Sequence, residues 1–339
     1  MTALNGWLVI DKPVGIGSTQ VVGAVKRALR EGGYAKVKVG HGGTLDPLAS
    51  GVLPIALGEA TKLAGRMLDA RKAYDFEVTF GTETAGLDAE GEVVSESDVR
   101  PTMAEVEAVL PCFTGLIEQV PPAYSALKVD GQRAYDLARR GEAVELAARS
   151  VEVFSLAILP GTGRGTSEAG GGAIGLSTRA VGSFQGPQPI HHPADVPPSQ
   201  RAGEEIAHLT LSATVSKGTY IRSLARDIAY ALGTVGHVTM LRRTQAGPFA
   251  LSQGISLDKL ADVAKARSLE EVVLPLEAGL DGIPALSLAP DEARLVRQGR
   301  TLSGQSVDDG AYLAKDGSVP VALVEVRAGA LSVLRGFNL

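Results

Sequence analysis

The stretch from Val39 to Gly58 reads VGHGGTLDPLASGVLPIALG and places one carboxylate, Asp46, between a glycine-rich turn and a proline. The apolar run that follows predicts a buried strand. A lone carboxylate on so constrained a loop suits nucleophilic or electrostatic work, in which it must meet an electron-poor carbon at fixed geometry. The alternative is structural, because an Asp before a proline commonly caps a turn. The local stretch leaves both roles open and by itself favours the turn cap.

Length and composition indicate a cytoplasmic protein with about two domains. The chain has 339 residues, which allows a large core and a smaller appendage. Its single cysteine, Cys112, excludes a disulfide framework and is expected to be a small buried hydrophobe beside Phe113. The amino terminus lacks the layout of a secretory signal, and no run approaches the roughly 20 apolar residues that span a bilayer. We therefore expect a soluble, cytoplasmic monomer with no membrane partner.

Charge is unevenly distributed, which matters more than the net charge of −5. Residues 1–80 carry 10 Lys or Arg against 7 acids, and residues 206–250 carry 5 against 1. Residues 81–110 carry 8 acids and one Arg. The two basic stretches would make one phosphate-facing surface if the fold brings them together, and ordinary solvated faces are the alternative.

Hydrophobic periodicity predicts alternating strands and helices. Residues 72–81 alternate cleanly, which predicts a half-buried strand with Tyr74 at the start of its apolar face. Ser18 is the expected N-cap of a helix that ends at residues 31–33. Thr102 and Glu105 form a capping box that predicts another helix. Further strands are expected at residues 6–12, 52–58, 208–215 and 238–249, and helices at residues 59–70 and 219–232.

The second half of the chain contains an insertion and a change of character. Residues 160–203 are rich in Gly, Pro and Ser without periodicity, which predicts a flexible insertion. His191, His192 and Asp195 lie in it, but a mobile loop would supply no groups to orient metal ligands, so we expect no metal site. After Pro275 the pattern predicts short strands and one short helix, at residues 290–299.

Several kinds of enzyme are disfavoured by missing motifs. The chain has no Walker glycine loop, and its glycines at 40–43 do not continue as G-x-G-x-x-G before a helix, so we expect no nucleotide cofactor. No G-x-S-x-G nucleophile elbow is present. Paired carboxylates for glycoside chemistry would need a partner for Asp46, and none lies nearby in the sequence.

The stretch GHGGTLDPLASGVLPIALGEATKLAG strongly resembles the catalytic stretch of the TruB-type tRNA pseudouridine synthases. The resemblance continues in the following motifs and covers nearly all of residues 6–249 outside the insertion: DKPVGIGSTQVV, KAYDFEVTFGTETAGLDAEGEV, QVPPAYSALKVDGQRAYDLARRG, SKGTYIRSLARDIAYALG and HVTMLRRTQAGPF. It implies an α+β pseudouridine synthase fold over residues 1–274, with a mixed, largely antiparallel sheet and flanking helices. It also implies a small β-rich, PUA-like RNA-binding domain over residues 275–339.

The resemblance implies an isomerase that converts the T-loop uridine of tRNA, at position 55, to pseudouridine without a cofactor or metal. Asp46 matches the catalytic aspartate of the family, and Tyr74 the tyrosine that packs on the target base. Arg222 is expected to pair with Asp46, because a planar guanidinium can hold a carboxylate ionised in one rotamer. Further substrate contacts are implied for Tyr220, Leu241, His41 and Lys12, the last of which could equally stabilise a loop. The implied partner is tRNA, through its T-arm and elbow.

The chain departs from the family pattern at two loops, where Gly42 replaces a usual Thr, and Gly17 with Ser18 replaces Thr-Ser. Both changes could loosen loops that grip RNA. Two other functions stay open: an RNA-folding protein that opens tRNA elbows, and a relative that modifies ribosomal RNA with a guide RNA. Asp46, Tyr74 and Arg222 together argue against the first, and nearly complete tRNA-type motifs without a long basic tail argue against the second.

Overall fold

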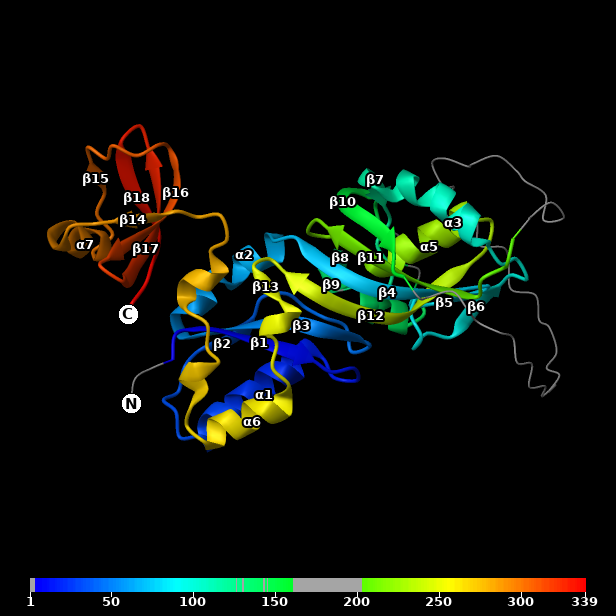
Figure 1. Ribbon diagram of the computed structural model, residues 1–339, viewed down its shortest axis with the longest axis horizontal. Coiled ribbons are helices and arrows are strands. Elements are labelled where there is room, and N and C mark those ends of the chain that lie inside the picture. Colours follow the sequence, from blue (N-terminus) through cyan, green and yellow to red (C-terminus); the bar gives the residue numbers. More distant parts are fainter. Residues whose placement is uncertain (1–3, 126, 130, 143, 145, 161–202) are drawn as a thin grey trace. The chain divides into compact units, whose positions relative to one another are not determined.

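A computed structural model describes residues 4–125, 127–129, 131–142, 144, 146–160 and 203–339 (Figure 1). The insertion predicted at residues 160–203, with His191, His192 and Asp195, lies almost entirely outside the described residues. The chain divides into two compact units, residues 1–73 with 242–339, and residues 74–241. This division differs from the predicted boundary at residue 274, which stays a prediction.

The first unit contains both ends of the chain. Before the division its elements are β1 (Gly6–Lys12), α1 (Ser18–Glu31), β2 (Val39–His41), β3 (Ala49–Leu57), η1 (Gly58–Leu63) and α2 (Ala64–Asp69). After it come β13 (Phe249–Ala250), η4 (Leu251–Gln253), α6 (Leu257–Lys265), η5 (Leu269–Glu271) and η6 (Leu276–Gly279). The carboxy-terminal part has β14 (Ala285–Ser287), α7 (Pro290–Arg297), β15 (Leu302–Ser303), β16 (Gly310–Asp316), β17 (Val319–Arg327) and β18 (Ala330–Gly336).

The second unit has β4 (Lys72–Phe80), β5 (Thr82–Thr84), β6 (Val93–Glu96), α3 (Met103–Val109), η2 (Leu110–Phe113), β7 (Gly115–Gln119), β8 (Lys128–Val129) and β9 (Gln132–Arg133). It continues with α4 (Ala134–Arg139), β10 (Arg149–Ile158), β11 (His208–Val215), α5 (Ile221–Ala231) and β12 (Gly236–Ala246). The last five residues of β12 and the first two of β4 belong to the first unit, so these two strands contribute to both units.

The strands of each unit follow a simple order. In the first unit β3 lies between β1 and β12, with β2 also on β3 and β13 on β12. In the second unit the order is β12, β4, β11, β10 and β7. The β1–β3 and β10–β11 pairs are antiparallel. The two strand orders share β12, and helices occur in both units beside these strands, so the predicted α+β class is confirmed.

The carboxy-terminal strands form their own sheet, in the order β14, β16, β17, β18 and β15. β14 is parallel to β16, while β16 with β17 and β17 with β18 are antiparallel. Side chains of α7 and these strands share one apolar cluster, which includes Val296, Val324 and Leu331. The β-rich carboxy-terminal part is therefore confirmed, including the helix at residues 290–297.

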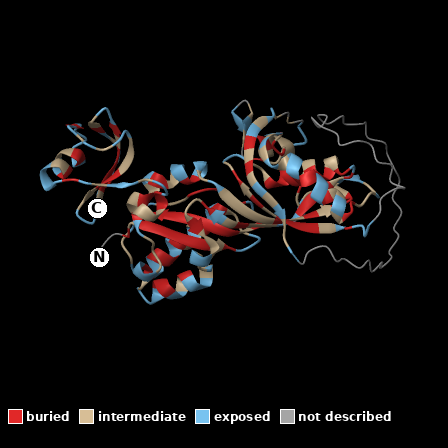
Figure 2. Cartoon of the chain, turned by 45° about the horizontal axis from the view of Figure 1, so that its top comes forward, coloured by how far each residue is buried: buried red, intermediate tan, exposed pale blue. Residues whose placement is uncertain are grey.

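Apolar side chains fill a separate core in each unit, and Figure 2 shows the buried residues concentrated along the strands. In the first unit Trp7 is fully buried in a cluster with Phe249 and Phe337. In the second unit Phe76, Val78 and Phe80 of β4 are buried, as the alternation predicts. Among the described residues, no helix is both long and apolar enough to cross a bilayer.

One local prediction is confirmed and two are wrong. Thr102 and Glu105 form the expected capping box at the start of α3, with bonds of 2.7 Å and 3.3 Å. The N-cap of α1, however, is Gly17, and Ser18 is a buried residue of its first turn. Cys112 is exposed, because η2 directs it away from the core cluster that Leu110 and Phe113 contact.

Candidate active site

The loop that carries Asp46 connects β2 to β3 in the first unit. Asp46 is exposed, whereas Leu45 before it is buried. The backbone N–H of Ala49 donates to the Asp46 carbonyl oxygen at 3.1 Å, which closes the turn around Pro47. The N–H of Gly42 donates to the Pro54 carbonyl oxygen at 2.8 Å and so fixes the other end of the loop on β3.

Ser18 holds the middle of this loop from the first turn of α1. Its hydroxyl accepts a bond from the N–H of Leu45 at 2.8 Å and donates to the carbonyl oxygen of the same residue at 3.1 Å. A buried backbone needs such partners, because an unpaired polar group there costs free energy. The buried serine therefore serves the loop, which is why it does not cap its own helix.

Lys12 fixes the part of the loop that follows Asp46. Its ammonium donates to the carbonyl oxygens of Pro13, Ile16 and Pro47 at 2.8, 2.7 and 3.2 Å, and the residue is fully buried. These contacts are those of a loop-stabilising residue, the alternative that the sequence left open for Lys12. Burial lowers the pKa of Lys12 to about 8, while the charge of Asp46 acts in the opposite direction and that of Arg243 adds to the decrease.

Arg243, on β12, fixes the part of the loop that precedes Asp46. Its guanidinium donates to the carbonyl oxygens of Val52, Thr44 and Gly43 at 2.7, 3.2 and 3.2 Å, and the residue is 1% exposed. Backbone groups on both sides of Asp46 are thus bonded to buried side chains that lie far away in the sequence. Such anchoring presents one carboxylate at the surface with little freedom of its backbone.

Gly42, where the resemblance led us to expect a Thr, is closely packed. A Cβ atom on this residue would lie 2.8 Å from Cβ of Met67, which is closer than real contacts allow. The glycine therefore accommodates Met67, a member of the first unit's core cluster. This packing gives the substitution a structural reason.

His41 lies at the end of β2 and is half-buried. Within the described part of the chain its Nδ1 is buried and has no hydrogen-bond partner. Burial, and then the charge of Arg243, lower the pKa of His41, so the neutral ring is favoured.

Two predicted contact residues border the core of the second unit. Tyr74 on β4 and Leu241 on β12 are both half-buried and pack against its apolar cluster. Each therefore has one side on the core and another that is accessible. Such positions suit an apolar contact with a base, and they would equally suit the margin of an ordinary core.

Arg222 lies on the first turn of α5 and is 7% exposed. Its Nη1 donates to Asp88 Oδ2 at 2.9 Å and to the Gly86 carbonyl oxygen at 2.8 Å, and its Nη2 donates to the Tyr124 carbonyl oxygen at 3.0 Å. Asp46 lies in the first unit and Arg222 in the second, and their pairing stays a prediction. The ion pair with Asp88 lies within the second unit.

Sequence reasoning missed several residues that hold the predicted ones. Ser18 was assigned to its own helix, and Arg243 and Asp88 were not singled out, although they lie in the MLRR and AGLDAEG motifs. A buried Arg on a strand is rare without a partner, so the adjacent arginines of MLRR carried a signal. Gln119, whose amide bonds to the backbone of Tyr220, carried no comparable signal.

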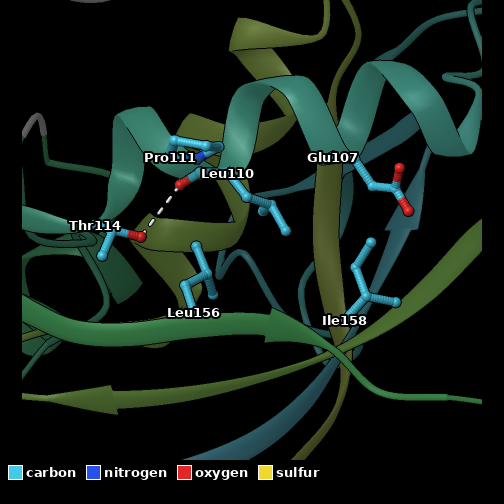
Figure 3. A pocket seen from close by; sticks show the side chains of 6 residues that line it. All are labelled: Glu107, Leu110, Pro111, Thr114, Leu156 and Ile158. Carbon is cyan, nitrogen blue, oxygen red and sulfur yellow. Dashed lines mark hydrogen bonds between the residues drawn. The ribbon is translucent and has the colours of Figure 1, made fainter.

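The second unit also has a surface hollow. It is bordered by α3, η2 and β10, and Figure 3 shows Thr114 Oγ1 bonded to the Leu110 carbonyl oxygen at its edge, 3.3 Å apart. The lining residues are Glu107, Leu110, Pro111, Thr114, Leu156 and Ile158. None of the predicted site residues lines it. No group of three or more potential metal ligands occurs among the described residues.

Comparison with known proteins identifies the family. The profile described as "TruB family pseudouridylate synthase (N terminal domain)" matches residues 29–167, and that of the "tRNA pseudouridylate synthase B C-terminal domain" matches residues 222–281. A tRNA pseudouridine synthase B from Novosphingobium aromaticivorans is 57% identical over 99% of this chain and 98% of its own length. The chain belongs to the tRNA pseudouridine synthase B family. It is therefore an isomerase of the pseudouridine synthase class.

Other members of the tRNA pseudouridine synthase B family also align along the whole chain. The protein of Zymomonas mobilis is 49% identical over 99% of this chain and 97% of its own length. Among solved structures, a Cbf5–Nop10–Gar1 complex contains a chain with a TM-score of 0.66 and 23% identity, covering 98% of this chain and 85% of that one. This likeness concerns the fold and confirms the expected pseudouridine synthase architecture.

Proposed function

We propose that this protein converts the T-loop uridine at position 55 of tRNA to pseudouridine, with Asp46 as the catalytic carboxylate. Its full-length relatives are named tRNA pseudouridine synthase B. The observation that carries the proposal for Asp46 is its setting: an exposed carboxylate on a loop whose neighbouring residues are bonded to buried Ser18, Lys12 and Arg243. A catalyst needs such a fixed group, and a simple turn cap does not need three remote anchors.

The reaction breaks the bond between C1′ of the ribose and N1 of uracil, turns the base and joins C1′ to C5. The proton on C5 is released and N1 gains a proton, so atoms and charge balance with no redox step. Asp46 can attack C1′, attack the base or assist loss of the C2′ proton, and these routes stay open. The base must leave the helical stack for each of them.

The other predicted site residues have supporting positions in the proposal. Tyr74 and Leu241 offer apolar surface at the margin of the second core, where a uracil could stack. Arg222 is held in one orientation by Asp88 and two carbonyl oxygens, which prepares it to meet an anion. His41, with a neutral ring favoured, is proposed to contact the RNA loop.

The test is the substitution Asp46→Asn, which removes the negative charge and the nucleophile but keeps the shape. The buried anchors bond to backbone groups next to Asp46, so we expect the loop to persist in this variant. With tRNA that carries tritium at C5 of uridine, label release should fall to background, while tRNA affinity should change by no more than about tenfold. Asp258→Asn, at an exposed carboxylate in α6 of the same unit, is the matched control.

Three results would count against the proposal. Appreciable label release by Asp46→Asn would remove Asp46 from the reaction. If Asp46→Asn lost both tRNA binding and label release, Asp46 would be a turn cap and not the catalytic residue. Absence of release by the unmodified protein, with tRNA still bound, would favour an RNA-folding protein instead.

A further inference from the structure

Tyr220 is held at the start of α5 by a neighbouring strand. The side-chain amide of Gln119, on β7, accepts a bond from the Tyr220 N–H at 2.7 Å and donates to the Tyr220 carbonyl oxygen at 3.1 Å. Gln119 is 1% exposed, so this pair of bonds is shielded from water. The backbone of Tyr220 is thereby fixed, and the remaining freedom of the residue lies in its ring.

Arg149 lies over that ring. It opens β10 and is the direct cross-strand neighbour of Gln119, so the two residues of one register pair hold the same tyrosine. The central carbon of the Arg149 guanidinium lies 4.8 Å from the centre of the Tyr220 ring, within the range of a cation–π contact. Its Nη2 also donates to the Gly218 carbonyl oxygen, in the turn that precedes Tyr220.

The turn itself contacts this arginine. Gly218 has φ +83°, a conformation that favours glycine, and a Cβ atom there would lie 3.6 Å from the Arg149 guanidinium. Within the described part of the chain the buried Nε of Arg149 has no hydrogen-bond partner. The contacts of Arg149 are therefore directed at the turn and the ring.

We propose that Arg149 is a positioning residue of the reaction, which holds the Tyr220 ring in the orientation that meets the target nucleoside. This inference rests on the proposed function, in which Tyr220 contacts the substrate. Gln119 fixes the backbone and Arg149 fixes the ring, so the tyrosine is ordered before the RNA arrives. Preordering of this kind speeds the step on bound RNA more than it strengthens binding.

A double-mutant cycle tests whether Arg149 acts through Tyr220. The single-turnover rate constant of tritium release at saturating tRNA is measured for Arg149→Met, Tyr220→Ala and the double variant, together with tRNA affinity. We expect Arg149→Met to slow release about 3- to 30-fold, the range of a cation–π contact, and to change affinity less than about twofold. In the Tyr220→Ala background the same substitution should have an effect below about twofold, since the ring is already gone.

Two variants complete the design. Arg149→Lys keeps the charge but not the planar group, so its release rate should lie between those of the unsubstituted protein and Arg149→Met. If Arg149→Met does not fold, Arg149→Lys replaces it in the double-mutant cycle. Arg139→Met is the matched control, because Arg139 lies 5.5 Å from the ring of another tyrosine, Tyr135. The effect of Arg139→Met on the release rate should be the same whether Tyr220 is present or replaced by alanine.

The outcomes separate the inference from the function on which it rests. An equal effect of Arg149→Met in both backgrounds would overturn the inference while leaving Tyr220 in place. If Arg149→Met weakened tRNA affinity and reduced the salt dependence of binding by about one charge, Arg149 would bind a phosphate of the RNA. That result would also overturn the inference. A normal rate for Tyr220→Ala would overturn the role of Tyr220 and, with it, that of Arg149.

Discussion

Replacing Arg243 by methionine would test the framework beneath the Asp46 loop. The guanidinium donates to the carbonyl oxygens of Val52, Thr44 and Gly43, and methionine fills part of its volume without a donor. Thr44 is exposed, so water can replace that bond, whereas Val52 and Gly43 are buried. Each buried group left unpaired costs about 1 to 3 kcal/mol, so the free energy of unfolding should fall by about 2 to 6 kcal/mol.

The neighbouring Arg242 provides the control. It forms an ion pair with Asp11 at 2.8 Å, and both side chains are 34% exposed. Pairs of this exposure contribute up to about 1 kcal/mol, so Arg242→Met should be mild. The two substitutions remove the same charge from adjacent positions of β12 and differ mainly in burial.

Urea denaturation followed by tryptophan fluorescence is the assay. The single tryptophan, Trp7, is fully buried in the first unit, the unit that contains the loop and both arginines. The slope of free energy against urea should stay the same in both variants, so that a shift of the midpoint reports stability. If Arg243→Met came within about 0.5 kcal/mol of Arg242→Met, buried carbonyl pairing would not be what fixes the loop.

Two further predictions concern the other anchors. Ser18→Ala leaves both the N–H and the carbonyl oxygen of buried Leu45 without a partner, so the free energy of unfolding should fall by about 2 to 6 kcal/mol and tritium release should slow. Calorimetry measures the first effect and the release assay the second, and unchanged values would exclude Ser18 as an anchor. Lys12 has a pKa of about 8 in the folded protein against 10.5 in the unfolded chain. The unfolded chain therefore binds more protons between these pH values, so Lys12 makes stability rise with pH there, by at most about 1.4 kcal/mol per unit. Urea denaturation at several pH values should show the stability of the unmodified protein rising relative to Lys12→Met across this window, and a flat or falling difference would contradict the lowered pKa.

The sequence by itself determined the elements whose signals are local. The alternation in residues 72–80 places Phe76, Val78 and Phe80 in the core because successive side chains of a strand point to opposite faces. Thr102 and Glu105 cap a helix through bonds that span three residues. The glycines and proline around Asp46 likewise indicated a constrained loop without any knowledge of its surroundings.

The tertiary structure alone decided which residues hold that loop. Ser18 reaches Leu45 across 27 positions and Arg243 reaches Val52 across 191, and such pairs depend on how strands align in the sheet. Periodicity reports which face of an element is buried, but not what it meets there. For the same reason the sequence predicted Ser18 as an N-cap and Cys112 as a core residue. A serine can cap a helix or bond to a neighbouring loop, and a cysteine can be buried or exposed, so the residue type alone does not decide its position.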